Sequence, residues 1–266
     1  MCGIVGYVGK RDCTDVLMSG LSKLEYRGYD SAGIAVFQEG RIVVAKAKGR
    51  LKNLEERMEK EGRPKGHVGI GHTRWATHGE PSDRNSHPHL GGKGKVAVVH
   101  NGIIENYKEL RERLEAHGYE FKSETDTETV AHLVDYLHTG KQEDLAKTVL
   151  AAVQRLRGSY ALGVVSMDNT QEIVAARRGN PLVIGIGEGE NMIASDITAI
   201  ISRTRKFIIL DDNEVAIVRP DEVIVMNEFG DKVEKEVQTV NWDMSAAEKG
   251  GYQHFMLKEI MEQPKA

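Results

Sequence analysis

Short apolar runs separated by turn residues dominate the first hundred residues. These runs predict strands over GIVGYVG (3–9), GIAVFQEGRIVVAKAKG (33–49), HVGIGHTRWATHG (67–79) and KVAVVHNGI (95–103). Within the second run, Glu39-Gly40 predicts the turn of a hairpin. We therefore expect the N-terminal hundred residues to consist of strands and turns.

Helical spacing replaces this pattern in the middle of the chain. Apolar residues three and four positions apart predict a helix that begins at Thr125 or Asp126 and stops at Gly140, with Val130, Leu133, Val134 and Leu137 on one face. Similar spacing predicts helices over 106–117 and 144–157, each closed by a glycine.

Strands resume after the helical block, with runs over 159–168, 172–179, 181–196, 206–227 and 232–242. Strands, then helices, then strands indicate an α+β fold with mainly antiparallel sheet, because a repeating βαβ unit would alternate the two. The pattern fails at Asp243, and a last helix begins within 252–264, where Pro264 halts it. We expect one domain over 2–242 and a linker over 243–266.

Composition and charge narrow the function classes. The chain has 40% hydrophobic and 29% charged residues, a formal net charge of -4 and no long basic run, so we expect neither nucleic acid nor an anionic membrane as a partner. No apolar run is long enough for a membrane span, and the start lacks the features of a secretory signal. These features predict a cytoplasmic protein, in which Cys2 and Cys13 stay reduced.

Cys2 stands directly behind Met1 in the opening stretch MCGIVGY. If Met1 is removed, one residue carries both a thiol and a free α-amino group, so a nucleophile and its base lie a few ångströms apart. Gly3 and Gly6 would let this strand approach a substrate closely. An inert terminal residue is the alternative for Cys2 when this stretch is taken alone.

Three further stretches contain groups suited to binding a small polar substrate. Arg74 could grip a carboxylate through two parallel hydrogen bonds, although it could equally be a surface residue. Asn101 and Gly102 end an apolar strand and could form an oxyanion hole, or simply a turn. Asp126 could hold an ammonium group, or act only as an N-cap.

Histidines make metal binding the rival hypothesis, since six of the ten lie close together in the sequence: His67, His72, His78, His87, His89 and His100. No H-E-x-x-H or C-x-x-C motif accompanies them, and they are spread over several strands and loops, which disfavours a zinc site. The stretch GIGEGE (185–190) fails the dinucleotide fingerprint, and no P-loop is present.

Six stretches in order carry a family resemblance: MCGIVGYVG, LEYRGYDSAGIA, GHTRWATHG, HNGIIENY, SETDTE and NPLVIGIGEGENMIASD. Together they resemble the glutaminase domain of the class II glutamine amidotransferases, which are N-terminal-nucleophile hydrolases. The forms YRGYDSAG and WATHG are similar to those of the glucosamine-6-phosphate synthase family. Amidophosphoribosyltransferases and asparagine synthetases share the Cys-Gly-Ile start but not these two forms.

The resemblance implies a four-layer αββα sandwich of two antiparallel sheets and a set of site residues. Cys2 would be the nucleophile, and Asn101 with the Gly102 amide would form the oxyanion hole. The glutamine α-carboxylate would be held by Arg74, Thr77 and His78, and its α-ammonium by Asp126 and the Gly102 carbonyl. The resemblance also implies a gating role for Trp75 and a position near the nucleophile for Arg27, and it leaves the role of His87 open.

The activity implied by the resemblance is hydrolysis of L-glutamine to L-glutamate and ammonia through a Cys2 thioester, with no metal or organic cofactor. In the full-length parent, expected to be a homo-oligomer, the ammonia would aminate fructose-6-phosphate in a sugar-isomerase domain. That domain is absent from this sequence, and 243–266 would be the linker and the truncated start of it. The alternatives are the amidotransferase domain of another class II enzyme and a non-catalytic glutamine-sensing module, although binding alone would need neither Cys2 nor Asn101.

Overall fold

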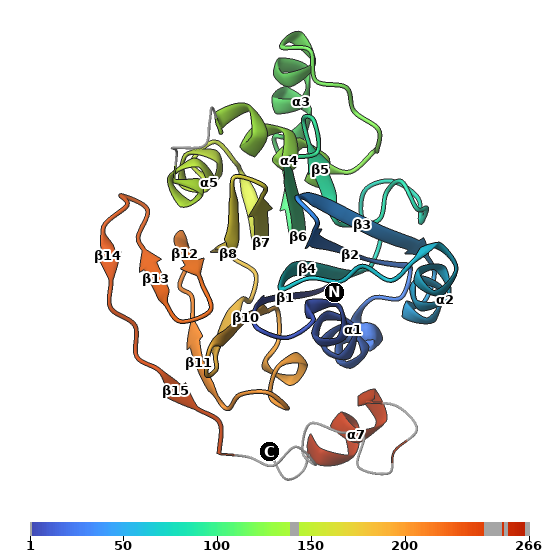
Figure 1. Ribbon diagram of the computed structural model, residues 1–266, viewed down its shortest axis with the longest axis vertical. Coiled ribbons are helices and arrows are strands. Elements are labelled where there is room, and N and C mark those ends of the chain that lie inside the picture. The colour runs from blue at the N-terminus through green and yellow to red at the C-terminus, as the bar shows by residue number, and fades with distance from the viewer. Residues whose placement is uncertain (1, 139–143, 242–251, 253–254, 264–266) are drawn as a thin grey trace.

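The computed structural model describes residues 2–138, 144–241, 252 and 255–263, and most of them form two antiparallel β-sheets with helices (Figure 1). The first sheet has eight strands in the order β15-β11-β9-β10-β1-β4-β2-β3. Its strands are β1 (Gly3–Gly9), β2 (Ser31–Gln38), β3 (Arg41–Lys48), β4 (Val68–Arg74), β9 (Val183–Ile186), β10 (Glu190–Ala194), β11 (Lys206–Ile209) and β15 (Gln238–Thr239).

The second sheet has seven strands in the order β14-β13-β12-β8-β7-β6-β5. Its strands are β5 (His89–Gly91), β6 (Val96–Ile104), β7 (Gly158–Ser166), β8 (Asn169–Arg178), β12 (Glu214–Val218), β13 (Val223–Met226) and β14 (Lys232–Val233). Neighbouring strands within each sheet run antiparallel, in agreement with the sheet type that the sequence predicts.

Helices cover the outer face of each sheet. Against the first sheet lie α1 (Cys13–Leu24) and α2 (Leu51–Glu61), and against the second lie α4 (Asp126–Leu137) and α5 (Leu145–Val153), with α3 (Tyr107–Ala116) packed on α4 (Figure 1). Two 3₁₀ turns, η1 (Glu25–Arg27) and η2 (Ile197–Ala199), and a last helix, α7 (Phe255–Glu262), complete the described elements. The result is the four-layer αββα sandwich expected from the family resemblance.

Three apolar layers hold these four layers together. The middle layer joins the inner faces of the two sheets and contains many small or β-branched residues, among them Val8, Ile70, Ala97, Ala161 and Ala175. The outer layers lie between each sheet and its helices. Because both sheets are covered on both faces, the central strands have uninterrupted buried runs; all seven residues of β1 are buried.

Two helices of the first sheet contradict the prediction that the first hundred residues contain only strands and turns. In α1, Leu17, Leu21 and Leu24 pack at helical spacing behind β1, and Asp12 caps the helix by accepting from the Thr14 amide at 3.1 Å. In α2, the buried residues are Leu51, Leu54 and Met58. Both helices are required because the outer face of the first sheet is apolar and must be covered.

The three predicted central helices are confirmed, with shorter bounds. Thr125, not Asp126, is the N-cap of α4, since its hydroxyl accepts from the Glu128 amide at 3.3 Å. The helix ends at Leu137, and the predicted stop at Gly140 lies outside the described residues, as do Trp242, Asp243 and Pro264. The Glu39-Gly40 turn is confirmed between β2 and β3, and both residues have a positive φ. No helix in the described ranges combines the length and apolar character needed to cross a membrane.

Glu128, in the first turn of α4, fixes the loop that leads into this helix. Its carboxylate accepts hydrogen bonds from the Lys122 amide at 2.9 Å and from the Ser123 amide and hydroxyl at 2.6 and 2.7 Å. Burial alone raises the pKa of Glu128, but nearby His132 and these hydrogen bonds outweigh it and lower the pKa to about 2. The loop and the helix start are therefore held by a buried carboxylate that stays charged.

Glu128→Gln should lower the free energy of unfolding by about 2 kcal/mol, because charge-assisted hydrogen bonds are replaced by weaker ones. The pKa of Glu128 is lower in the folded chain than in the unfolded one, so its stabilisation is complete above about pH 4.3 and fades as the pH falls toward 2. Urea unfolding of both proteins from pH 3 to pH 7 measures this. The control is Glu115→Gln, which breaks the ion pair between Glu115 and Arg111 on the surface of α3 and should change stability little. An equal loss in both variants would contradict the assignment.

Candidate active site

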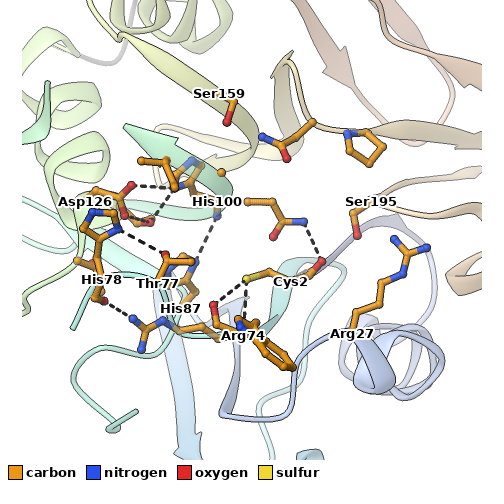
Figure 2. Close-up of a pocket in the computed structure, with 18 residues that line it drawn as sticks. Cys2, Arg27, Arg74, Thr77, His78, His87, His100, Asp126, Ser159 and Ser195 are labelled. Carbon is orange, nitrogen blue, oxygen red and sulfur yellow. Dashed lines mark hydrogen bonds and ion pairs between the residues drawn. The ribbon is translucent and has the colours of Figure 1, made fainter. Parts of the chain in front are cut away.

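One cavity of about 340 Å³ opens where the ends of β1, β4 and β6 meet the start of α4. A volume of this size suits a small metabolite. The structure brings every site residue predicted from the sequence to its wall: Cys2, Arg27, Arg74, Trp75, Thr77, His78, His87, Asn101, Gly102 and Asp126. Figure 2 shows Cys2 between two sides of the cavity, with Asp126, Thr77 and His78 on one side and Arg27 and Ser195 on the other.

Cys2 immediately precedes β1, the strand at the centre of the first sheet. Its Sγ lies 3.2 Å from the Trp75 amide, which donates to it, and 3.5 Å from the Trp75 carbonyl. Burial raises the pKa of the Cys2 thiol above its ordinary value, while the Trp75 amide opposes this shift. The thiol is therefore mostly protonated at neutral pH and needs a base to become a nucleophile.

Asn101 and Gly102 approach Cys2 from β6, in the second sheet. The Asn101 Nδ2 group donates to the main-chain carbonyl of Cys2 at 3.1 Å. Gly102 has φ of 132°, and a Cβ at this position would lie 2.1 Å from the Ser159 carbonyl oxygen on β7. Only glycine fits here, because any side chain would collide with the neighbouring strand β7.

Arg74, the last residue of β4, is buried and holds the loop that follows it. Its guanidinium donates to the carbonyls of His78, of Gly79 at 3.0 Å and of Glu80 at 3.4 Å. Burial lowers the pKa of Arg74, and the neighbouring Cys2 and Asp126 groups oppose this shift. The side chain thus offers positive charge to the cavity while it fixes the 75–80 loop.

Asp30 supports the same loop from the β2 side. Its carboxylate accepts from the Ala76 amide at 2.8 Å, and its own amide donates to the Arg74 carbonyl at 3.0 Å. The preceding Gly28 lies so close to Arg74 that a Cβ there would be 2.8 Å from the Arg74 carbonyl carbon. The YRGYDSAG stretch is therefore built to hold the backbone that carries Arg74 and Trp75.

Asp126 faces the cavity from the first turn of α4 and is almost completely buried. One carboxylate oxygen accepts from the Ile104 amide at 2.9 Å, which ties the helix start to the end of β6. Negative charge is thereby placed across the cavity from Arg27 and Ser195 (Figure 2).

Trp75 and Arg27 form the rim. The Trp75 side chain is 46% exposed and meets the Tyr29 ring edge-on, with centroids 5.7 Å apart. Arg27 lines the cavity, but its guanidinium pairs with Asp196 and its Nε donates to the Tyr26 hydroxyl at 3.0 Å. Cys2 thus shares its cavity with an exposed indole and with a cation already engaged with a carboxylate.

Four of the six clustered histidines are buried: His87 and His100 line the cavity, and His72 and His89 lie behind it. The His72 and His87 rings stack at 4.1 Å, and His89 meets His87 edge-on at 5.1 Å. Burial lowers the pKa of all four, so they are neutral at neutral pH. Within the described ranges, no group of three or more histidine, cysteine or acidic residues is arranged to hold a metal.

Sequence reasoning missed several residues that shape the site. The sequence assigns no role to Asp30, and for His72 it suggests only a metal-ligand role. Ser195 lines the cavity and its Oγ accepts from the Ile4 amide at 3.0 Å, and Asn180 lines the far wall. Ser195 and Asn180 stand in the quoted stretch NPLVIGIGEGENMIASD, but no local pattern assigns either of them a role, because the fold brings them to the cavity.

A sandwich of two antiparallel sheets, with a cysteine at the head of a central strand, defines the class: an N-terminal-nucleophile hydrolase fold. A family model described as a glutamine amidotransferase domain matches residues 72–202. The chain carries a class II glutamine amidotransferase domain.

Curated relatives agree over the whole chain. A glutamine--fructose-6-phosphate aminotransferase (isomerizing) of Caldanaerobacter subterraneus subsp. tengcongensis is 57% identical over 266 residues, which are 100% of this chain and 43% of the relative. The protein of the same name from Thermotoga maritima is 52% identical over 266 residues, again covering 43% of its length. The chain therefore spans less than half the length of these relatives.

Solved structures with the same fold include glutamine phosphoribosylpyrophosphate amidotransferase from B. subtilis. It superposes with a TM-score of 0.71 at 25% identity, covering 85% of this chain and 49% of that one. A structure titled as the allosteric regulatory enzyme of purine biosynthesis gives a TM-score of 0.73 at 26% identity, with the same coverage.

The two cysteines should differ sharply in reactivity. Cys2 is partly exposed at the cavity, whereas Cys13 is fully buried in α1 and its pKa is raised to about 12. Iodoacetamide should therefore label Cys2 and spare Cys13 in the folded protein, as peptide mass spectrometry can measure. Because burial raises the pKa of Cys2, labelling should still accelerate above pH 9. Cys2→Ala is the control, and labelling of Cys13 at a rate similar to Cys2 would contradict this prediction.

Proposed function

We propose that this chain hydrolyses L-glutamine to L-glutamate and ammonia through a γ-glutamyl thioester on Cys2. The observation that supports this most is the convergence on one cavity of a thiol, an amide donor, a buried cation and a buried carboxylate: Cys2, Asn101, Arg74 and Asp126. A thiol nucleophile beside an amide donor suits attack on a carboxamide. The cation and the carboxylate suit the two charged groups of an amino acid.

Activation of the thiol needs a base close to Sγ. We propose that removal of Met1, which lies outside the described residues, gives Cys2 a free α-amino group that takes the thiol proton. The thiolate then attacks the side-chain carboxamide carbon (Cδ) of glutamine, the C–N bond breaks, and the departing nitrogen takes the proton held by the Cys2 α-ammonium group and leaves as ammonia. Water attacks the thioester, so that glutamate leaves and the thiol is regenerated.

Charge that develops on the γ-carbonyl oxygen needs donors that are already in place. The Asn101 Nδ2 group, 3.1 Å from the Cys2 carbonyl, is close enough to supply one, and the Gly102 amide is the proposed second donor. Both positions are rigid, since Asn101 lies within β6 and Gly102 can only be glycine.

The rest of glutamine is held by its two charged groups. We assign the α-carboxylate to Arg74, with help from Thr77 and His78, and the α-ammonium to Asp126 and the Gly102 carbonyl. Burial of Arg74 and Asp126 strengthens both contacts, because the local dielectric is low. Trp75 at the rim is suited to gate the exit of ammonia, and Arg27, paired with Asp196, would order the wall beside the nucleophile.

In the complete protein, we propose that the ammonia reaches fructose-6-phosphate bound in a sugar-isomerase domain that this sequence does not include. The relatives support this, since their names give that activity and this chain spans only 43% of their length. We place the glutaminase domain at 2–242 and the linker with the start of the next domain at 243–266. We further propose that the complete protein is a cytoplasmic homo-oligomer, whose reduced compartment keeps Cys2 as a free thiol.

Cys2→Ala should abolish ammonia release from glutamine, because it removes the nucleophile. Glutamine binding should stay intact, because Arg74 and Asp126, which hold the two charged groups of glutamine, are unchanged. A coupled glutamate assay measures turnover, and calorimetry with glutamine measures binding. Cys13→Ala, in the buried core, is the matched control and should keep turnover in whatever fraction folds. Ammonia release by the Cys2 variant would refute the mechanism, and glutamine binding with no turnover in the wild-type chain would indicate a sensing module.

Asn101→Ala should lower kcat by about 10² to 10³ with little change in KM, the usual cost of losing one oxyanion donor. Steady-state kinetics with glutamine separates the two constants. A change confined to KM would instead make Asn101 a substrate-binding or turn residue.

A further inference from the structure

His72 links the two sheets directly behind the nucleophile. It lies on β4, in the first sheet, paired with Ile4 of β1 and Gly33 of β2, and its side chain is completely buried. Its Nε2 atom lies 3.0 Å from Asn101 Oδ1 and 3.1 Å from the His100 main-chain oxygen, both on β6 of the second sheet. A single ring nitrogen therefore reaches two acceptors on the strand that carries the proposed oxyanion donor.

The direction of these hydrogen bonds is fixed by carbonyl groups at both ends. The His100 carbonyl can only accept, so Nε2 of His72 carries the hydrogen and donates. The Cys2 carbonyl can also only accept, so the Asn101 amide must turn its NH₂ group toward Cys2 and its oxygen toward His72. The reverse orientation of the amide would bring two carbonyl oxygens together at Cys2.

We propose that His72 is a positioning residue, which holds the Asn101 side-chain amide with its NH₂ group toward Cys2 and the developing oxyanion. This inference rests on the proposed function, in which Asn101 stabilises that oxyanion. His72 does not reach the cavity wall, so it acts only through Asn101.

The surroundings of His72 suit a fixed neutral donor. Its ring stacks on His87 with centroids 4.1 Å apart, which prevents rotation, and this also gives His87 a role as a support. Burial lowers the pKa of His72 to about 3, so the ring is neutral at working pH. Its Nδ1 atom is buried and finds no hydrogen-bond partner in the described structure, so Nε2 is the nitrogen that the site uses.

Removal of this donor would leave Asn101 Oδ1 without its hydrogen bond, and the amide could then turn its NH₂ group toward the His100 carbonyl instead. Each molecule with a reversed amide lacks the oxyanion donor. Loss of one neutral hydrogen bond corresponds to a fall of about threefold to tenfold in the productive population. We expect the fall in kcat, with KM unchanged, since Arg74 and Asp126 are untouched.

Three variants of His72 distinguish the loss of its hydrogen-bond donor from the loss of its packing against neighbouring side chains. His72→Phe keeps a ring to stack on His87, and His72→Met is a flexible side chain of similar volume; neither can donate. His72→Gln retains an N–H group at the same distance along the side chain as Nε2. The control is His132→Phe, a buried histidine on α4 outside this cavity. Each folded variant is assayed for kcat and KM with glutamine, for iodoacetamide labelling of Cys2 and for its melting temperature.

The expected result is a fall of about threefold to tenfold in kcat for the Phe and Met variants, with KM and Cys2 labelling unchanged, and near wild-type kcat for the Gln and His132 variants. The inference is overturned if a folded Phe or Met variant keeps the wild-type kcat, if Gln falls as far as Phe, or if Cys2 labelling falls in parallel with kcat. An inactive wild-type chain would instead refute the proposed function, so the two failures are distinguishable.

Discussion

The site exists only because the two sheets lie face to face, since Cys2 heads a strand of one sheet and Asn101 lies within a strand of the other. Their approach depends on small residues in the middle apolar layer. At Gly6 of β1, a Cβ would meet Ile173 of β8, in the other sheet, at 3.1 Å, and at Gly163 of β7 it would meet Ile193 of β10, again across the two sheets, at 2.8 Å. A larger residue at either glycine would push the sheets apart, and the hydrogen bonds between them would be lost along with the cavity.

Strand patterns were the part of this protein that the sequence predicted well. Buried apolar runs between turns marked the central strands, because these strands are covered on both faces. The helices α1 and α2 were missed although their spacing is visible in Leu17, Leu21 and Leu24 and again in Leu51, Leu54 and Met58. The short segments between strong strand signals were read as turns, and only the need to cover the outer face of a sheet shows why they are helices.

The residues of the candidate site also fall into two groups: those that the sequence indicates and those that only the fold reveals. Cys2, Arg74 and Asp126 stand at strand or helix ends and Asn101 lies within β6, and each is a chemically suggestive residue that can be recognised one stretch at a time. Asp30 and His72 act through hydrogen bonds to Ala76 and Asn101, on other strands or loops. Their roles depend on which strands are neighbours and in what register, and a single sequence does not contain that information in any local pattern.

The histidines behind the cavity are polar, although apolar side chains could be buried there at a lower cost in free energy. His72 shows why a polar residue is used. An apolar side chain at position 72 would fill the space but leave Asn101 Oδ1 buried without a partner, which is costly in a dry interior. A lysine could donate, yet it would bring an uncompensated charge beside Arg74. A histidine whose pKa is held at about 3 donates without charge, and it does so throughout the range in which the thiol and the α-amino group titrate. The proposed oxyanion donor is thereby held in one orientation while the protonation of the nucleophile changes beside it.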